Sequence, residues 1–198
     1  MATIYTPAFE KAIDHAMKYE VGGEWDENHP AVELGLIDTQ INRRATGYVN
    51  DPFDNGGETK FGVARNANQD IDVTNLTWDG AKAVYYVRYW IAGKCDYLTG
   101  RIAALHFDGC VNHGVKRAST FLQRAAGVNP DGNVGAITVT KAKEMNQFVL
   151  CNSIADHREQ FYRSIVRNNP TQERYLNGWL RRITEVRAFV TNTDNSFD

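Results

Sequence analysis

The sequence predicts a mainly α-helical fold with one small β-hairpin or irregular element near the front of the chain. Apolar residues recur every three or four positions over most of the 198 residues, which is the period of a helix with one buried face. That period is lost only between about residues 24 and 63, where turn-forming and polar residues dominate. A hydrophobic content of 42% and a charged content of 23% are typical of a globular protein, and the length suits one domain or two closely packed lobes.

The first predicted helix carries an apolar stripe that ends on a carboxylate. Glu20 continues the stripe three residues after Met17, and Gly22-Gly23 then ends the helix. A carboxyl group on the apolar side of a helix is the first anomaly in the sequence. The apolar members of the stripe are Phe9, Ile13, Ala16 and Met17.

Residues 24–50 are predicted to form a loop with little regular structure. A dense cluster of turn formers follows at residues 51–57, with the sequence Asp-Pro-Phe-Asp-Asn-Gly-Gly. Thr59, Phe61 and Val63 then alternate with other residues, which predicts a short strand or one arm of a hairpin.

The remainder of the chain is predicted to be helical. Thr77 caps the first of these helices, Gly114 and Gly127 each end one, and a turn at residues 130–132 separates two more. The expected helices cover about residues 78–90, 102–113, 118–126, 136 onward, 148–166 and 175–190, and residues 192–198 are expected to fray.

Composition excludes several classes of protein. A net charge of -2 lacks the overall excess of positive charge that is typical of proteins that bind nucleic acid. Cys95, Cys110 and Cys151 form no CxxC pair, so we expect small buried thiols in a reducing compartment. The spacing of His106 and His113 does not place two ligands on one helix face, so no metal is expected.

The front of the sequence lacks a basic segment followed by an apolar run, so we expect no secretory signal peptide. No apolar stretch is long enough to span a bilayer. The expectation is a soluble product made in the cytosol, which needs help to reach any substrate outside the membrane.

Glu20 is the first candidate for chemistry. A carboxyl group that faces apolar surroundings loses hydration, which raises its pKa and can keep it protonated near neutral pH. A protonated carboxyl is what a general acid needs to protonate the leaving oxygen of a glycosidic bond. The alternative is that Glu20 merely turns outward at a frayed helix end.

The turn cluster supplies candidates for a second group. Glycosidic cleavage needs a nucleophile or base opposite the acid, and Asp51 and Asp54 lie on a Gly-rich turn that could approach the helix end. Gly57 lets a sugar approach the backbone, and the Thr59 hydroxyl could orient a water molecule. The alternative for both aspartates is that they only stabilise the turn.

At this point the sequence resembles a known family. Lys18-Tyr19-Glu20, Gly22-Gly23 and the run from Gly47 to Val63 are similar to the front half of glycoside hydrolase family 108, the phage-type N-acetylmuramidases whose Glu-Gly-Gly-Tyr motif supplies the acid. The second half resembles the peptidoglycan-binding region that accompanies that enzyme. The matching segments there are residues 89–90, 107–114, 118–123, 128–135 and 175–182.

One departure from the family pattern is an insertion. Val21 interrupts the motif, and a stretch from about residue 23 to residue 46 separates Glu20 from Gly47-Tyr48. Glu24 could occupy the acid position instead, although Glu20 fits both the helix stripe and the preceding Lys-Tyr.

The resemblance implies a lysozyme-like helical fold and hydrolysis of the β-1,4 bond between N-acetylmuramic acid and N-acetylglucosamine, without a cofactor. It implies an acid glutamate, a turn aspartate and a threonine, which we assign to Glu20, Asp54 and Thr59. We favour Asp54 over Asp51 as the second carboxylate because it lies nearer the tip of the turn. Asp51, Gly57, Tyr48 and Asn112 would bind substrate. We expect residue 58 to be a solvated glutamate.

The resemblance also implies an organisation and a setting. Residues 1–97 would form the catalytic lobe, residues 98–190 the helical peptidoglycan-binding lobe and residues 191–198 a tail. The partner would be bacterial peptidoglycan, with no nucleic acid, no stable membrane insertion and a monomeric protein. By analogy the protein is an endolysin held in the host cytoplasm until a holin releases it at lysis.

Three alternatives stay open at this stage. The chain could be a wall-binding module without catalysis, a lytic transglycosylase that leaves an anhydro sugar, or a hydrolase delivered by a virion tail or secretion apparatus. The arginines of the last helix are expected to be solvated while its apolar face packs on the body. Contact of those arginines with anionic envelope polymers is the second possibility.

Overall fold

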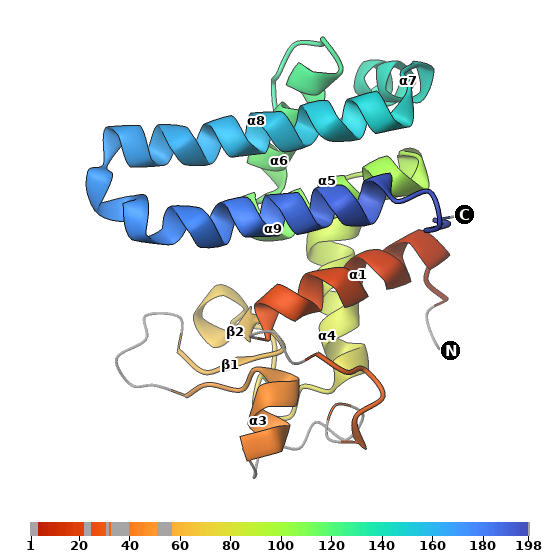
Figure 1. Ribbon diagram of the computed structural model, residues 1–198. Coiled ribbons are helices and arrows are strands. Elements are labelled where there is room, and N and C mark those ends of the chain that lie inside the picture. The colour runs from red at the N-terminus through yellow and green to blue at the C-terminus, as the bar shows by residue number, and fades with distance from the viewer. Residues whose placement is uncertain (1–3, 22–24, 31, 33–39, 51–56, 198) are drawn as a thin grey trace. The chain divides into compact units, whose positions relative to one another are not determined.

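The computed structural model describes residues 4–21, 25–30, 32, 40–50 and 57–197. The chain divides into two compact units (Figure 1). The first, here called the helical unit, comprises Met1–Ala12 and Val87–Asp198, and the second, the hairpin unit, comprises Ile13–Tyr86. The expected division between a catalytic lobe that ends at residue 97 and a peptidoglycan-binding lobe that begins at residue 98 stays a prediction.

The helical unit is built around α5 (Gly100–His113), which packs against three other helices. Its partners are α6 (Val115–Ala125), α8 (Gln147–Asn168) and α9 (Glu173–Thr191), and α7 (Ala136–Glu144) packs against α8. Figure 1 shows α8 and α9 running antiparallel, joined by the short 3-10 turn Pro170–Gln172. The predicted mainly α fold class is confirmed.

Helix ends follow the chemistry that the sequence predicts. The Asn146 side chain accepts hydrogen bonds from the backbone N–H groups of Phe148 and Val149 at 3.0 and 3.2 Å and so caps α8. Gly114 ends α5 at a φ of 78°, a backbone conformation that residues with a Cβ adopt at a cost. The predicted stop at Gly114 is therefore confirmed.

A buried ion network ties three helices of this unit together. Asp108 of α5 accepts hydrogen bonds from Arg158 of α8 at 2.5 Å and from Arg182 of α9 at 2.9 and 3.1 Å. Burial raises the pKa of the Asp108 carboxyl, but the Arg182 and Arg158 charges outweigh it and hold that pKa well below its usual range. The expectation that the arginines of the last helix are solvated is wrong for Arg182, which is buried.

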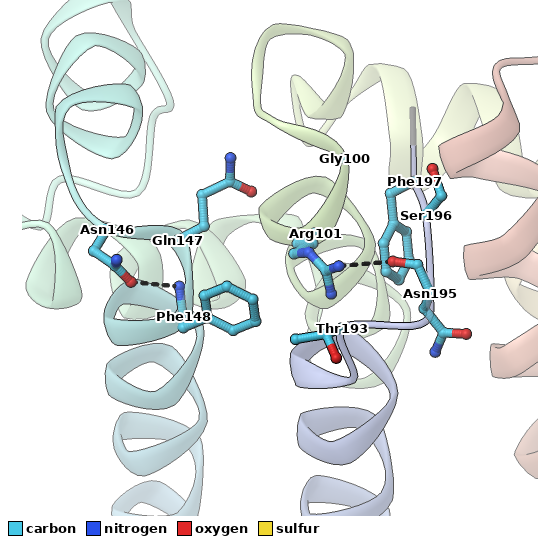
Figure 2. A pocket seen from close by; sticks show the side chains of 9 residues that line it. All are labelled: Gly100, Arg101, Asn146, Gln147, Phe148, Thr193, Asn195, Ser196 and Phe197. Carbon is cyan, nitrogen blue, oxygen red and sulfur yellow. Dashed lines mark hydrogen bonds between the residues drawn. The ribbon is translucent and has the colours of Figure 1, made fainter.

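The C-terminal segment does not fray, contrary to expectation, because Arg101 holds it. The Arg101 guanidinium donates hydrogen bonds to the backbone oxygens of Val190, Asn192 and Asn195 at 2.7 to 2.8 Å. Figure 2 shows this side chain at the centre of a polar hollow of about 510 Å³, with Phe148 on one side and Phe197 on the other. Their rings lie 5.1 and 5.4 Å from the guanidinium carbon.

The three cysteines are free and buried, as predicted. Cys110 Sγ lies 3.6 Å from His106 Nε2, and the Cys95 and Cys110 thiols hydrogen-bond to one another. Within the helices that the structure describes, none is long and apolar enough to cross a membrane.

The hairpin unit contains the end of α1 (Pro7–Glu20), the short α3 (Gln40–Thr46), the two-stranded antiparallel sheet and α4 (Trp78–Tyr85). α4 continues as a π-helical segment from Tyr86 to Ile91. Thr77 caps α4 as predicted, since its hydroxyl accepts a hydrogen bond from the Gly80 N–H at 3.2 Å. The prediction of little regular structure over residues 24–50 is wrong at α3.

The hairpin pairs β1 (Thr59–Lys60) with β2 (Val63–Ala64). The predicted hairpin is confirmed, but Thr59, Phe61 and Val63 do not alternate along one strand. Phe61 and Gly62 form the turn at φ values of 51° and 73°. The Phe61 conformation is one that local sequence disfavours, and contacts from distant residues support it: its N–H donates to the Thr46 carbonyl at 2.5 Å.

Candidate active site

The apolar stripe of α1 leads directly to Glu20. Ile13, Ala16 and Met17 are buried, whereas Glu20, the last residue of the helix, is half-buried. The predicted helix is therefore confirmed, and its packed face directs the Glu20 carboxyl inward rather than out to a frayed end. A position partly removed from water but still accessible is what an acid that must meet a substrate requires.

The turn of the hairpin packs against the Glu20 side chain. A Cβ placed on Gly62 would lie 2.9 Å from Glu20 Cβ and 3.4 Å from Glu20 Oε2, and it would clash with the Tyr85 hydroxyl. Gly62 also has a φ of 73°. Both observations require glycine here, because only its missing side chain lets the turn approach the carboxyl so closely.

Tyr85 connects α4 to the same turn. Its buried hydroxyl donates a hydrogen bond to the Phe61 carbonyl at 3.0 Å. The hydroxyl therefore fixes the turn that lies beside Glu20. Tyr85 is therefore a buried residue whose polar end lies at the candidate site.

A second glycine brings another segment against the end of α1. A Cβ on Gly47 would lie 3.0 Å from Val21 Cα, and Gly47 has a φ of 59°. The segment that leads into the hairpin therefore touches the residue next to Glu20. Together, Gly47 and Gly62 position two loops around the candidate acid.

Thr59 lies in β1, where Val49 forms an additional bridge to the two-stranded sheet. Its N–H and C=O bond to Val49 at 2.8 and 2.9 Å, in addition to its pairing with Ala64. The Thr59 hydroxyl donates to the Gly57 carbonyl at 3.3 Å, which leaves its lone pairs to accept a further hydrogen bond. Gly57 has a φ of 67°, and a Cβ there would lie 3.2 Å from the Asn66 side chain.

Glu58 is not the solvated side chain that alternation predicted. Its side chain is 10% exposed and accepts hydrogen bonds from Arg65 Nε and the Thr74 hydroxyl, both at 3.1 Å. The Arg65 hydrogen bond, with further help from Thr74 and Tyr48, lowers the pKa of the Glu58 carboxyl below its usual value. A carboxyl held ionised in this way is unsuited to donate a proton.

Tyr48 is one of the residues predicted to bind substrate. Its hydroxyl hydrogen-bonds to Glu58, and its side chain lines an open hollow of about 430 Å³ together with Arg43, Val49 and Asn50. An aromatic side chain and neighbouring polar groups are suited to a sugar ring, so Tyr48 keeps its predicted role as a candidate.

The remaining candidates are placed as follows. Asp51, Asp54 and Glu24 lie outside the described residues, so their roles stay predictions. Asn112 lies on α5 in the helical unit, where its side-chain oxygen accepts a hydrogen bond from Tyr162 of α8. Among the residues that the structure describes, no group of three or more His, Cys, Asp or Glu side chains could hold a metal ion.

Sequence reasoning missed Gly62, whose turn packs against Glu20, and Tyr85, whose hydroxyl holds that turn. A signal for Gly62 was present, since Phe61-Gly62 falls between two short runs of strand-forming residues. No local signal marked Tyr85, because its hydroxyl bonds to a carbonyl 24 residues away in sequence.

Comparison with known families identifies two regions of the chain. The family model described as glycosyl hydrolase 108 matches residues 26–114, and the one described as a predicted peptidoglycan domain matches residues 117–184. The chain therefore contains a glycosyl hydrolase 108 region followed by a predicted peptidoglycan domain. These two matches indicate a glycoside hydrolase associated with peptidoglycan.

The match to the glycosyl hydrolase 108 model begins six residues after Glu20. It contains Tyr48, Gly57, Thr59 and Tyr85 but not the candidate acid. The case for Glu20 therefore depends on its place in α1 and on its contacts with the hairpin turn.

A solved structure with the same fold is described as the structure of Brucella abortus SagA. It is 24% identical in sequence, has a TM-score of 0.70, and the match covers 95% of this chain and 96% of SagA. That likeness establishes the fold over nearly the whole length. No curated protein matches the chain.

Proposed function

We propose that this glycosyl hydrolase 108 protein is an N-acetylmuramidase that cleaves the β-1,4 bond between N-acetylmuramic acid and N-acetylglucosamine. The observation that carries the proposal is the half-buried Glu20 carboxyl at the end of an apolar helix stripe, packed against Gly62 and beside the Tyr85 hydroxyl. Glu20 acts as the general acid that protonates the leaving oxygen.

The second carboxylate is Asp54, with Asp51 as the neighbouring candidate. Thr59 holds the water molecule through its hydroxyl, which already donates to Gly57 and so offers its lone pairs. Glu58 does not take the acid role, because Arg65, Thr74 and Tyr48 stabilise its ionised form. Two carboxyl groups and water suffice for hydrolysis, so the reaction needs no cofactor.

The biological setting that fits this activity is lysis of a bacterial host. The protein acts as a monomeric endolysin that waits in the host cytoplasm and reaches the wall once a holin opens the membrane. The resemblance to phage-type muramidases supports this setting, and the peptidoglycan domain supports the wall as the partner.

The test compares three glutamate variants on isolated Gram-negative sacculi. Wild-type protein, Glu20→Gln and Glu24→Gln are incubated with sacculi, and released muropeptides are identified by mass spectrometry. The matched control is Glu144→Gln, because Glu144 is exposed and forms only a surface ion pair with Lys141. The expected result is reducing N-acetylmuramic acid ends from the wild type and the control, and none from Glu20→Gln.

Each other outcome identifies an alternative. Anhydro ends would indicate a lytic transglycosylase, and intact glycan with binding retained would indicate a wall-binding module. Cleavage by Glu20→Gln together with loss of cleavage in Glu24→Gln would move the acid to residue 24. Circular dichroism of each variant shows whether lost cleavage reflects lost folding.

A further inference from the structure

A basic pocket lies where α5 passes into α6. It is a hollow of about 530 Å³, and its charged lining consists of Lys116, Arg117 and Arg124. No carboxylate contributes to the lining. The whole chain has a net charge of -2, so this concentration of positive charge is local and does not reflect a general excess of basic residues.

The three cations have no acidic partner within the part of the chain that the structure describes. Some other cations of the helical unit are paired, among them Arg163 with Glu159 and Arg187 with Asp156. The acid of the nearby turn, Asp131, is occupied by the Gln123 side chain at 2.7 Å and the Asn133 N–H at 2.8 Å. The positive charge of the basic pocket is therefore available to a ligand.

Packing holds two of the cations in place. The Arg117 guanidinium carbon lies 4.4 Å from the centroid of the Phe161 ring, a cation–π arrangement that fixes its plane. The stem of Lys116 packs on Gly132, whose absent Cβ would lie 2.7 Å from Lys116 Cγ. Cations that are already oriented lose less conformational entropy when they bind an anion.

The basic pocket has open space beside Gly114, and the histidine that lines it, His113, is uncharged. No atom lies within 4 Å of the position that a Cβ on Gly114 would take. Burial, helped by the neighbouring Arg158 charge, lowers the pKa of the His113 imidazole to about 3, so His113 is uncharged at neutral pH. The attraction for an anion thus comes from Lys116, Arg117 and Arg124 alone.

We infer that the basic pocket binds the free carboxylates of the peptide stems of peptidoglycan. This inference rests on the proposed function, because it takes the wall polymer as the substrate. In the intact polymer the lactyl carboxyl of each N-acetylmuramic acid is amide-linked to its stem peptide, so the glycan backbone is uncharged. The stem peptides carry free carboxylates, which guanidinium and ammonium groups bind through charge-assisted hydrogen bonds. The pocket extends into residues 117–184, the region matched by the peptidoglycan domain.

The experiment measures binding to intact sacculi in a Glu20→Gln background, which keeps the polymer uncleaved. A pocket variant carries Lys116→Gln, Arg117→Gln and Arg124→Gln. The control variant carries Lys94→Gln, Lys143→Gln and Arg167→Gln, which changes the net charge equally at exposed cations outside the pocket and outside the last helix. Each protein is sedimented with sacculi whose stem carboxylates are free and with sacculi whose carboxylates have been chemically amidated.

The expected result is that the pocket variant binds untreated sacculi about tenfold or more weakly than the control variant. Amidation should weaken the control variant by a similar factor and leave the pocket variant unchanged. Equal binding by the two variants on untreated sacculi would overturn the inference, as would an equal effect of amidation on both. In a parallel sedimentation with vesicles that contain phosphatidylglycerol, a loss of binding by the pocket variant that is absent with sacculi would assign the pocket to anionic lipid and also overturn the inference.

A cleavage experiment separates this inference from the proposed function. With Glu20 restored, the pocket variant should release less product than the control variant from untreated sacculi but the same amount from sacculi whose stem carboxylates have been amidated. If no protein cleaves either substrate, the proposed function fails, while the binding comparison still decides the role of the pocket.

Discussion

Replacing Asp108 with asparagine removes the one negative charge from a buried cluster that also contains two arginines. Asp108 and Arg158 have side chains that are 3% and 1% exposed, and Arg182 is 10% exposed. The asparagine has nearly the same shape, so the substitution changes charge without opening a large cavity. Two guanidinium groups are then left facing a neutral amide.

The expected cost follows from what remains buried. Breaking a buried ion pair by removing one partner costs about 3 to 5 kcal/mol, because the other charge stays desolvated. Total stabilities are on the order of 5 to 15 kcal/mol, so Asp108→Asn should remove a large fraction. At this chain length each kcal/mol corresponds to a shift of about 2 to 4 °C, which gives a fall in Tm of about 6 to 20 °C.

The assay is urea unfolding at pH 7, with Asp156→Asn as the matched control. Asp156 forms an ion pair with Arg187 at the surface, where its side chain is 56% exposed. An exposed pair of this kind contributes about 0 to 1 kcal/mol. A cost for Asp108→Asn no larger than that of the control would refute the argument that the buried network stabilises the helical unit.

The dependence of protein stability on pH provides a second test of the Asp108 network. The folded-state pKa of Asp108 lies below its unfolded value of about 3.9, so its contribution is complete above that pH and is lost as the pH falls toward the folded pKa. The difference between wild type and Asp108→Asn should therefore be constant from about pH 5 to 8 and shrink below about pH 4. The lowered pKa of His113 also reduces stability below about pH 6.5 in both proteins. Because the Asp108 charge raises that pKa, Asp108→Asn lowers it further, and the two His113 contributions cancel only well above pH 3.

Three further predictions concern the surroundings of Glu20. Gly62→Ala should abolish most glycan cleavage and destabilise the protein, because the new Cβ would clash with Tyr85 and lie 2.9 Å from Glu20 Cβ. The control is Gly127→Ala, at a φ of 68° with open space around it. This control should cost only about 1 to 2 kcal/mol of stability and leave cleavage intact. Thermal melts and muropeptide release measure both. Tyr85→Phe should cost about 1 kcal/mol and slow cleavage, since the Phe61 carbonyl loses its donor; an unchanged rate would show that the hydrogen bond does not position the turn. Glu58→Gln should leave the pH range of cleavage unchanged, because Arg65 holds Glu58 ionised; complete loss of activity in a folded variant would instead make Glu58 a participant in the chemistry.

The helices could be predicted from the sequence because their burial is one-sided. Apolar spacing at Phe9, Ile13 and Met17 reports a buried face directly, and caps such as Thr77 and stops such as Gly114 act within a few residues. The hairpin could be predicted as an element but its turn could not. Phe61 takes a left-handed conformation that depends on Thr46 and Tyr85, which are distant in sequence.

The residues of the candidate site also fall into those that the sequence could predict and those that it could not. Glu20 could be found because a carboxylate interrupted a local apolar pattern. The Glu58 network could not, because its partners Arg65 and Thr74 lie 7 and 16 residues away and alternation placed the side chain in solvent. Local patterns therefore identify which face a side chain occupies, whereas its partners depend on the tertiary fold.

Asp108 and Glu20 show why a carboxylate on a buried helix face does not identify a catalytic acid by itself. Both occupy such faces, but Asp108 lies between two guanidinium groups that keep it ionised, and its removal should cost stability. Glu20 is half-buried at a helix end, beside a glycine turn and a tyrosine hydroxyl. Residues that serve chemistry are often less than optimal for stability, so Glu20→Gln should lose cleavage while its Tm is unchanged or higher. A fall in Tm comparable to that of Asp108→Asn would mean that Glu20 is a structural carboxylate, and the acid would have to be sought elsewhere.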